Sequence, residues 1–351
     1  MKTRFWKVRA DFAVISLFLV ACLNAGLPAQ ELFEGQWLTE TSGDNRRVCL
    51  TLIYRGAEFG RNTISRDIDP RQMHVTSLSP GSVDRSVVEL EIRRDAGLFR
   101  CEGWFQNNKG SGHFTFVPNA GFATELQRRG YEAPSAREQF LLALHDVSLS
   151  FVDELSRQGY QRSSMHDLVR AGTHGVTLDY VRDLGELGYT LGTLDQLIRM
   201  RDHGVTPPYI KELAAAGYPK LDADQLIQTR DHGVTIDYIQ KLQSLGYRMP
   251  PLDELVRTRD HGVSGAYVEE LRRFGYQGLE LNELVRMRDH GVTPSFISAL
   301  QQEGYAHISV SDLIRLRDHG VNADYVRTLR SRGMTNLSID ELIRLRSSGF
   351  R

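Results

Sequence analysis

A histidine recurs every 29 residues through the C-terminal two-thirds of the chain, and this period constrains the fold more than any other feature. A tyrosine series keeps the same period. Self-similarity at a fixed period of about 20–50 residues is typical of repeat architectures. The sequence therefore predicts about eight tandem copies of one unit over residues 118–351. The two series are His145, His174, His203, His232, His261, His290 and His319, and Tyr131, Tyr160, Tyr189, Tyr218, Tyr247, Tyr276 and Tyr305.

Each unit has the start and stop signals of two short helices. Thr193, followed three residues later by Gln196, is typical of a helix N-terminus with a capping box. Gly204 supplies the left-handed residue that ends this helix, and Gly217 ends the next one, which begins at Pro207. Helices of about 9–11 residues are marginal alone in water, so neighbouring hairpins must stack. The sequence predicts an α-solenoid of two-helix repeats.

The apolar residue four positions before each glycine indicates which helix carries the core. In the first helix of the repeat this position varies, and Thr229 and Thr258 are polar. In the second helix every copy is leucine, so we expect that helix to carry the continuous core. The leucines are Leu126, Leu155, Leu184, Leu213, Leu242, Leu271, Leu300 and Leu329.

Residues 30–117 have a different pattern, with a period of two. The stretch 47–54 is β-branched and apolar, and the stretch 86–93 alternates between apolar and polar residues from Val88 onward. The stretches 98–105 and 113–116 follow after turns that contain Asn, Asp and Gly. This pattern is typical of β-hairpins. We expect five to seven antiparallel strands as a small sandwich or open barrel, with residues 56–80 as a long loop. The predicted fold class is α+β multidomain, an N-terminal antiparallel β domain followed by the α-solenoid.

Residues 1–29 resemble an export signal. A basic segment ends at Arg9, and an apolar run over residues 12–23 follows. This run is too short for a membrane span of about 20 residues and is typical of a signal peptide. Leu19-Val20-Ala21-Cys22 resembles the bacterial lipobox, which makes Cys22 a lipidation candidate. Conventional cleavage before Gln30 and an uncleaved anchor are the alternatives, and all three predict the periplasm or cell envelope.

Export also bears on the two remaining cysteines, Cys49 and Cys101. Both lie in strand-like stretches of residues 30–117. In an oxidising compartment an even pair favours a disulfide. The alternative is a pair of buried free thiols.

Arg-Asp-His-Gly occurs five times, at 201–204, 230–233, 259–262, 288–291 and 317–320. An aspartate at a helix C-terminus opposes the helix macrodipole, so a cation must offset it. We expect Arg and Asp to interleave as a ladder between repeats, with His bonded to a neighbouring backbone group or carboxylate. The rival interpretation is a binding row that holds metal or senses pH. The ladder candidates are Asp202, His203, Asp231, His232, Asp260, His261, Asp289, His290, Asp318 and His319.

A shared metal fits this row poorly. Packed helices lie about 8–10 Å apart, whereas zinc needs each imidazole nitrogen at about 2.0–2.1 Å. The chain also has no Gly-x-Ser-x-Gly, His-Glu-x-x-His or Cys-x-x-Cys motif. Residues repeated in every unit are what packing requires, whereas a catalytic constellation usually occurs once. We therefore expect that this protein is not an enzyme and that it has neither a cofactor nor a metal site.

The net charge of the chain limits the classes of partner that it is expected to bind. The formal net charge is -1, and the first 29 residues carry +3, from Lys2, Arg4, Lys7, Arg9 and Asp11. The remaining chain is mildly acidic, which disfavours nucleic acid and anionic membranes as partners. We expect a scaffold that binds a protein or peptide. The alternative is a ligand sensor, in which the β domain binds a small molecule or glycan and the repeats act as a spacer or transmitter.

The Leu-x-Arg-Asp-His-Gly-Val-Thr-x-x-Tyr unit resembles the tandem repeats of a group of bacterial exported proteins. The resemblance covers about residues 118–351 and extends to the strands at 99–116. In some relatives similar arrays follow sensor or membrane-peptidase-like modules. The peptidase-like module has no counterpart here, so no proteolytic role carries over. The resemblance implies an envelope location and a role in signalling or interaction.

Overall fold

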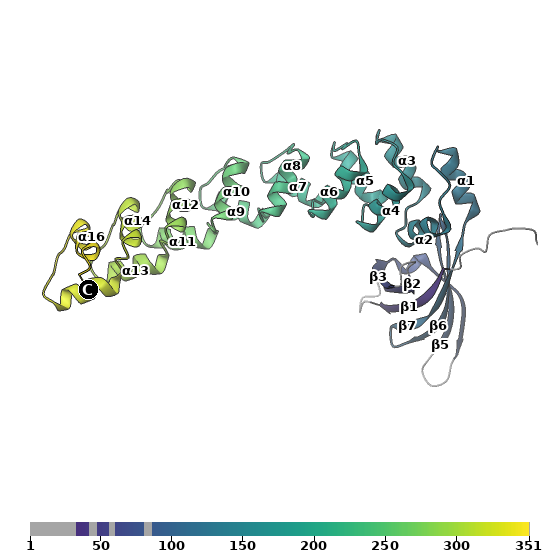
Figure 1. Cartoon of the computed structure of the whole chain (residues 1–351), viewed down its shortest axis with the longest axis horizontal. Coiled ribbons are helices and arrows are strands. Elements are labelled where there is room, and N and C mark those ends of the chain that lie inside the picture. Colours follow the sequence, from purple (N-terminus) through teal and green to yellow (C-terminus); the bar gives the residue numbers. More distant parts are fainter. Residues whose placement is uncertain (1–32, 42–47, 56–59, 81–85, 351) are drawn as a thin grey trace, which may run out of the picture.

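The computed structural model describes residues 33–41, 48–55, 60–80 and 86–350. Within them the chain forms an antiparallel β-sheet over residues 33–118, followed by sixteen α-helices. Figure 1 shows the sheet at one end of an elongated row of helices. The predicted fold class, an N-terminal β domain followed by a helical repeat region, is confirmed. No helix within these ranges is long and apolar enough to cross a membrane.

The seven strands form a single sheet in the order β3-β2-β1-β7-β6-β5-β4, and every pair is antiparallel. A single 3-10 turn, η1 (Pro70–Gln72), joins the two edge strands, β3 and β4. The strands are β1 (Phe33–Thr41), β2 (Val48–Arg55), β3 (Arg61–Ile68), β4 (Met73–Pro80), β5 (Ser86–Arg94), β6 (Gly97–Gln106) and β7 (Lys109–Pro118).

The prediction of a long loop over residues 56–80 was wrong, because β3 and β4 lie in this stretch. Strand β3 was not predicted because it is an edge strand of mostly polar residues. Ile68 is the one residue of this strand that is buried. An edge strand with one solvated side lacks the strong apolar alternation that marks a central strand.

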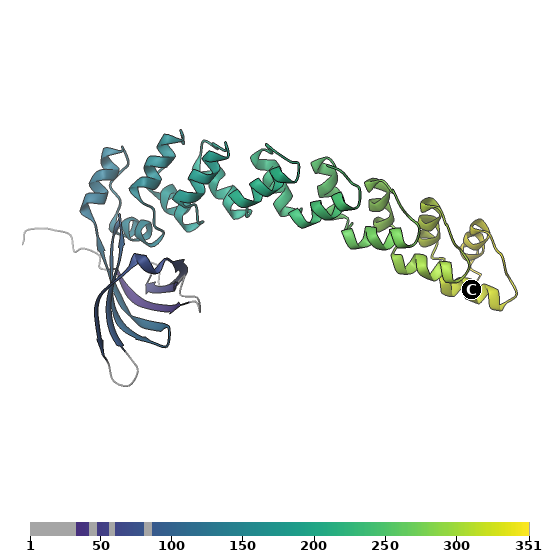
Figure 2. The same cartoon turned by 180° about the vertical axis from the view of Figure 1, so that it is seen from behind.

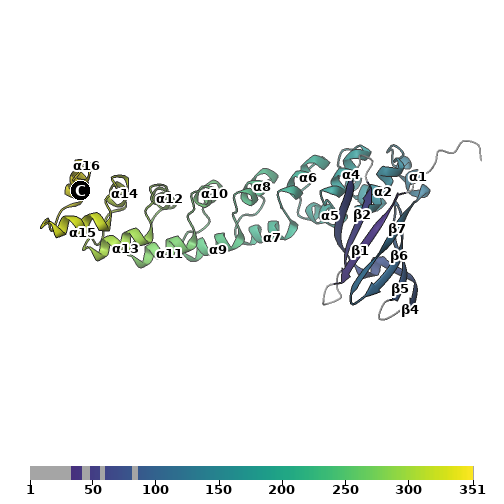
Figure 3. The ribbon, with the colours of Figure 1, turned by 60° about the horizontal axis from the view of Figure 1, so that its bottom comes forward.

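The sixteen helices are all nine residues long and keep the 29-residue period. Figure 3 shows them in two rows, which we call the A row, the first helix of each unit, and the B row, the second. The A row comprises α2 (Ala136–Leu144), α4 (Met165–Thr173), α6 (Leu194–Asp202), α8 (Ala223–Asp231), α10 (Leu252–Asp260), α12 (Leu281–Asp289), α14 (Val310–Asp318) and α16 (Ile339–Ser347). The B row comprises α1 (Ala120–Arg128), α3 (Leu149–Arg157), α5 (Leu178–Glu186), α7 (Pro207–Ala215), α9 (Ile236–Ser244), α11 (Gly265–Arg273), α13 (Pro294–Gln302) and α15 (Ala323–Ser331).

Every one of these helices ends in the same way. In α6 the Val205 amide donates to the Met200 carbonyl at 2.9 Å, and the Gly204 amide donates to the Arg201 carbonyl at 3.0 Å. This pair of bonds is the Schellman motif, which satisfies carbonyls that the helix leaves free. Fifteen of the sixteen helices use glycine at the left-handed position, and α2 uses Asp146, with φ of 57°. The expected N-cap is present at Thr193, whose side chain accepts from the Gln196 amide, and the reciprocal bond of a capping box is formed instead at other A-row helices, such as α8 and α16.

The core is shared more evenly between the rows than the leucine pattern indicated. The eight B-row leucines are at most 3% exposed, in agreement with the expectation. However, Met200, Thr229 and Thr258 of the A row are also fully buried. The threonines are tolerated because each hydroxyl donates to a carbonyl three residues earlier in its own helix, as Thr229 does to Leu226 at 2.8 Å.

The first A-row helix, α2, also packs against the sheet. Phe140 is fully buried and contacts aromatic rings of β1, β2, β6 and β7, including Phe33 at a centroid distance of 4.8 Å. Beside it, the Gln139 amide donates to the carbonyls of Ala96 and Asn119 at 2.8 and 2.6 Å. Figure 2 shows the sheet beneath the first helices, with the rest of the array extending away.

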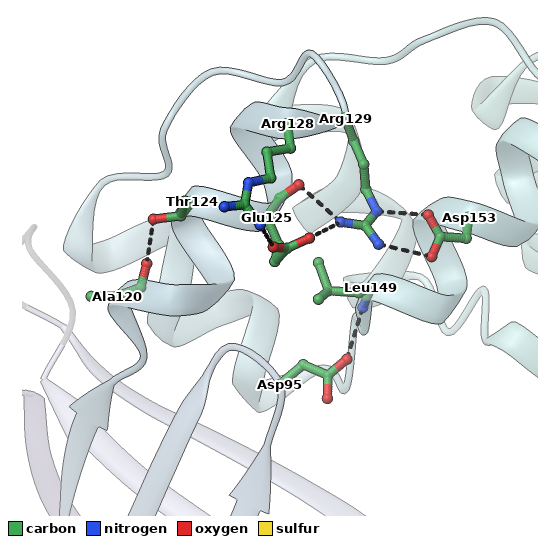
Figure 4. A network of polar contacts seen from close by, with 8 residues as sticks. All are labelled: Asp95, Ala120, Thr124, Glu125, Arg128, Arg129, Leu149 and Asp153. Atoms are coloured by element: carbon green, nitrogen blue, oxygen red, sulfur yellow. Dashed lines mark hydrogen bonds and ion pairs between the residues drawn. The ribbon is translucent and has the colours of Figure 1, made fainter.

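Polar contacts tie the sheet to the next hairpin (Figure 4). The Asp95 carboxylate, in the β5–β6 turn, accepts from the Leu149 amide at the start of α3 at 2.9 Å. Arg129, after α1, bridges to Asp153 of α3 at 2.6 Å and to Glu125 at 2.8 Å. The sheet and the first repeats therefore form one continuous packed unit.

We predict that Phe140→Ala destabilises this unit by about 3–5 kcal/mol, because a large buried ring is lost and its cavity cannot collapse. Urea unfolding followed by tryptophan fluorescence measures this, since Trp37 is buried in the same sheet. Leu141→Ala, on the half-buried side of the same helix, is the control and should cost much less. Equal effects of the two substitutions would show that the Phe140 ring does not hold the sheet on the array.

Candidate functional site

Five consecutive histidines of the 29-residue series, His174 and those of the first four Arg-Asp-His-Gly motifs, each contact the aspartate of the next repeat. Histidine Nδ1 and aspartate Oδ1 lie 2.5–2.8 Å apart in five successive rungs. Both side chains are about 40–45% exposed, so each rung contributes little, about 0.2–1 kcal/mol, and only the repetition makes the ladder matter. The rungs are His174–Asp202, His203–Asp231, His232–Asp260, His261–Asp289 and His290–Asp318, and His319 meets Ser347 at 3.2 Å.

The arginine of the motif takes a different position from the one expected. Instead of interleaving with these aspartates, it stacks over an aromatic ring of the preceding B-row helix. Arg230, for example, lies 4.6 Å from the centroid of the Tyr209 ring. Arg259 also donates from Nε to the Gly233 carbonyl at 2.9 Å, beyond the end of the preceding A-row helix. The cation therefore offsets the macrodipole of its neighbour rather than that of its own helix alone.

The same stacking recurs along the array. The guanidinium carbon lies 4.6–5.3 Å from the ring centroid in each pair. The pairs are Arg201 over Tyr180, Arg230 over Tyr209, Arg259 over Tyr238, Arg288 over Tyr267, Arg317 over Phe296 and Arg346 over Tyr325.

A second set of arginines does pair with carboxylates between repeats. Arg199 lies 2.5 Å from Asp224, and Arg315 lies 2.7 Å from Asp340. The period of these contacts is again one repeat, but they use the arginine two positions before the motif. Ion pairing between repeats is thus present, and the residues that make it differ from those expected.

Tyrosine hydroxyls add a third set of contacts between repeats. The Tyr209 hydroxyl donates to the Val234 carbonyl at 2.9 Å, and the Tyr218 hydroxyl donates to the Pro250 carbonyl at 2.8 Å. Burial raises the pKa of Tyr218 and of Tyr267 to about 12, so both stay protonated donors. The repeated polar residues are therefore engaged with neighbouring repeats. Over the described residues, no three His, Cys, Asp or Glu side chains gather as metal ligands.

The expected disulfide between Cys49 and Cys101 was wrong, because both cysteines are free. Cys49 is exposed on β2, whereas Cys101 is 1% exposed on the inner face of β6. Strands β1 and β7 lie between them, and neighbouring strands are about 4.8 Å apart, while a disulfide needs Cα atoms within about 7 Å. Burial raises the pKa of Cys101 to about 12, which keeps its thiol protonated. The candidate signal, residues 1–29, and Cys22 lie outside the described residues.

The structure also brings together two residues that the sequence analysis did not connect, Arg66 of β3 and His145. His145 begins the histidine series, but the position of its aspartate partner holds Thr173. Its Nδ1 instead accepts from Arg66, and its Nε2 lies 3.4 Å from the Thr173 hydroxyl. One sequence signal could have marked this exception. The residue before the histidine is aspartate in the Arg-Asp-His-Gly motifs, but it is Leu144 before His145 and Thr173 before His174.

No protein-family model matches this chain, and no curated protein or solved structure is similar to it.

We predict that acid weakens the junction through His145. Burial, and then the charge of Arg66, lower the pKa of His145 to about 4, from 6.5 in the unfolded chain. The unfolded state therefore binds the proton more readily, and the stabilisation present above pH 6.5 is lost as the pH falls. Between pH 7 and pH 5 this loss is about 2 kcal/mol.

The matched variant is His145→Asn, whose amide oxygen keeps an acceptor for Arg66 without titrating. Its free energy of unfolding should fall by about 2 kcal/mol less than that of the wild type between pH 7 and pH 5. Urea unfolding at both pH values checks this. The same pH dependence in both proteins would mean that His145 titrates normally in the folded state.

Proposed function

We propose that this protein is a non-enzymatic binding scaffold of the cell envelope, whose B row recognises a protein or peptide. The envelope location rests on the signal-like segment at residues 1–29. The binding role rests on one observation, namely that the exposed side chains at the C-terminal end of the B-row helices differ from repeat to repeat, whereas the C-terminal end of the A-row helices is identical in five consecutive repeats.

The uniform side is the C-terminal end of the A-row helices. Arg-Asp-His is identical in five consecutive repeats, and the contacts of this triplet run to the neighbouring repeats. A surface whose polar groups are already paired with each other has few free donors and acceptors for a partner. We therefore assign this side to holding the stack together.

The B row has the opposite character. The last residue of each B-row helix is exposed, and its chemistry changes along the array. The series is Arg128, Arg157, Glu186, Ala215, Ser244, Arg273, Gln302 and Ser331. The position one turn earlier varies as well, as Thr124, Asp153, Arg182, Lys211, Gln240, Glu269, Ser298 and Arg327.

These two positions lie four residues apart and so share one side of each helix. Ion pairs such as Lys241–Glu269, at 2.5 Å, join particular neighbours rather than every repeat. Stacked hairpins present an extended surface, and a non-repeating set of side chains can distinguish one partner from another along it. An extended B-row surface fits a protein or a long peptide better than a small molecule.

The test is cross-linking with mass spectrometry in intact cells that produce the full chain, using a carbodiimide that joins amines to carboxylates. The variant combines Ala215→Arg, Ser244→Arg and Gln302→Arg. Cations are tolerated at helix C-termini, so the fold should persist while the surface changes. We expect cross-links from the B row to a protein partner in the wild type and their loss in this variant.

Gln228→Arg is the matched control, because it adds an arginine to the A row at a position where Arg199 and Arg257 already occur in other repeats. Its cross-links should equal those of the wild type. Partner cross-links confined to residues 33–118, or unchanged in the B-row variant, would contradict the proposal.

A further inference from the structure

A cavity of about 440 Å³ lies where the sheet meets the array. Its wall comes from β2, β3, β5 and β6, from the C-terminal end of α2 and from the start of α5. Volumes of about 300–1,000 Å³ and a position between two structural units are typical of small-molecule sites. The scaffold role assigned to the B row does not use this cavity.

The sheet side of the cavity is apolar. Leu50 and Leu52 of β2, Ile92 of β5 and Phe99 of β6 line it, and each is at most 7% exposed in the folded chain. Ile64 and Ile68 of β3 add to the same wall. Branched aliphatic side chains dominate, so this end of the cavity suits a hydrocarbon group.

Arg66 supplies a positive charge at the edge of this apolar wall. It alternates with Ile64 and Ile68 on the inward side of β3, and its side chain is partly buried. Its guanidinium donates to His145 Nδ1 and to the Gly172 carbonyl, the latter at 3.1 Å. Both acceptors are neutral, since burial keeps the pKa of His145 at about 4.

The other charges at the rim are balanced or exposed. Arg94 lies 3.3 Å from Asp146, and Asp69 accepts two bonds from Arg71 at 2.9 and 3.0 Å. Asp67 of β3 is exposed, and Asp179 is exposed in the first turn of α5, where the helix dipole favours a carboxylate. Among the residues that the structure describes, Arg66 is therefore the cavity cation whose hydrogen bonds go to neutral acceptors, and the carboxylate that acts on its charge, Asp146, is also paired with Arg94.

We propose that this cavity binds a small aliphatic carboxylate, with the carboxylate on the Arg66 guanidinium and the hydrocarbon chain against β2, β5 and β6. A guanidinium presents forked N–H donors that match a carboxylate, and the pairing is strong where water is excluded. The ligand would touch both the sheet and α5, so it would join the β domain to the array. In a sensor whose β domain binds a small molecule and whose repeats respond to it, the ligand must contact both the sheet and the repeats, as it would here.

The test is isothermal titration calorimetry of the full chain with sodium decanoate as the probe. We expect saturable binding of one decanoate per chain. Decan-1-ol and decyltrimethylammonium have similar chains without the negative charge and should bind at least tenfold more weakly. Absence of saturable decanoate binding, or equal binding of all three probes, would overturn the proposal.

Two substitutions separate the charge from the apolar wall. Arg66→Gln should weaken decanoate at least tenfold, and Ile64→Phe should weaken it by filling the cavity. Arg100→Gln, an exposed arginine on the outer face of β6, is the matched control and should bind decanoate as the wild type does. Circular dichroism establishes that each variant is folded. If Arg66→Gln is unfolded, Ile64→Phe and the probe comparison decide, and unchanged binding by Ile64→Phe refutes the proposal.

Discussion

The array depends on one constraint, namely that none of its nine-residue helices is stable alone. A helix of this length gains too few hydrogen bonds to repay its nucleation, so each hairpin must draw its stability from its neighbours. The Schellman ends set the geometry of each hairpin, and the contacts between repeats then hold the stack. At the C-terminal end of α10, Arg259 and Asp260 reach backward to Tyr238 and His232, and His261, the residue after the helix, reaches forward to Asp289. The motif that stands out in the sequence is thus a connector between units.

The local part of this architecture could be predicted from the sequence, because it depends on residues close in the chain. Gly204 with Val205 defines a helix end, and Thr193 with Gln196 defines a start. The partner of each motif residue could not be predicted, since it depends on how successive hairpins are rotated. For this reason the motif arginines were expected to interleave with the aspartates, whereas the structure places them over aromatic rings; the histidines lie beside carboxylates, one of the two partners expected for them.

The β domain shows a similar division. Strands β2, β5, β6 and β7 follow from apolar stretches of the sequence, but β3 is a polar edge strand, so neither this strand nor the inward position of Arg66 could be predicted. The prediction of a Cys49–Cys101 disulfide was wrong because a sequence gives the number of cysteines but not the strand and the face of the sheet on which each one lies. Arg66 and His145 are 79 residues apart in sequence and meet only because α2 packs into the sheet. The junction between the sheet and the first repeats is therefore the part of the molecule that could not be predicted from the sequence.

The claim that the motif couples neighbouring repeats can be tested most directly by hydrogen exchange of the full chain carrying Arg259→Ala. Arg259 lies over Tyr238 and donates to the Gly233 carbonyl, so its loss should speed amide exchange at the end of α8 and the start of α9, in the preceding hairpin. Arg273→Ala, an exposed arginine at the end of α11, should leave exchange in α8 and α9 unchanged. Faster exchange confined to α10, or no change in either variant, would contradict the account.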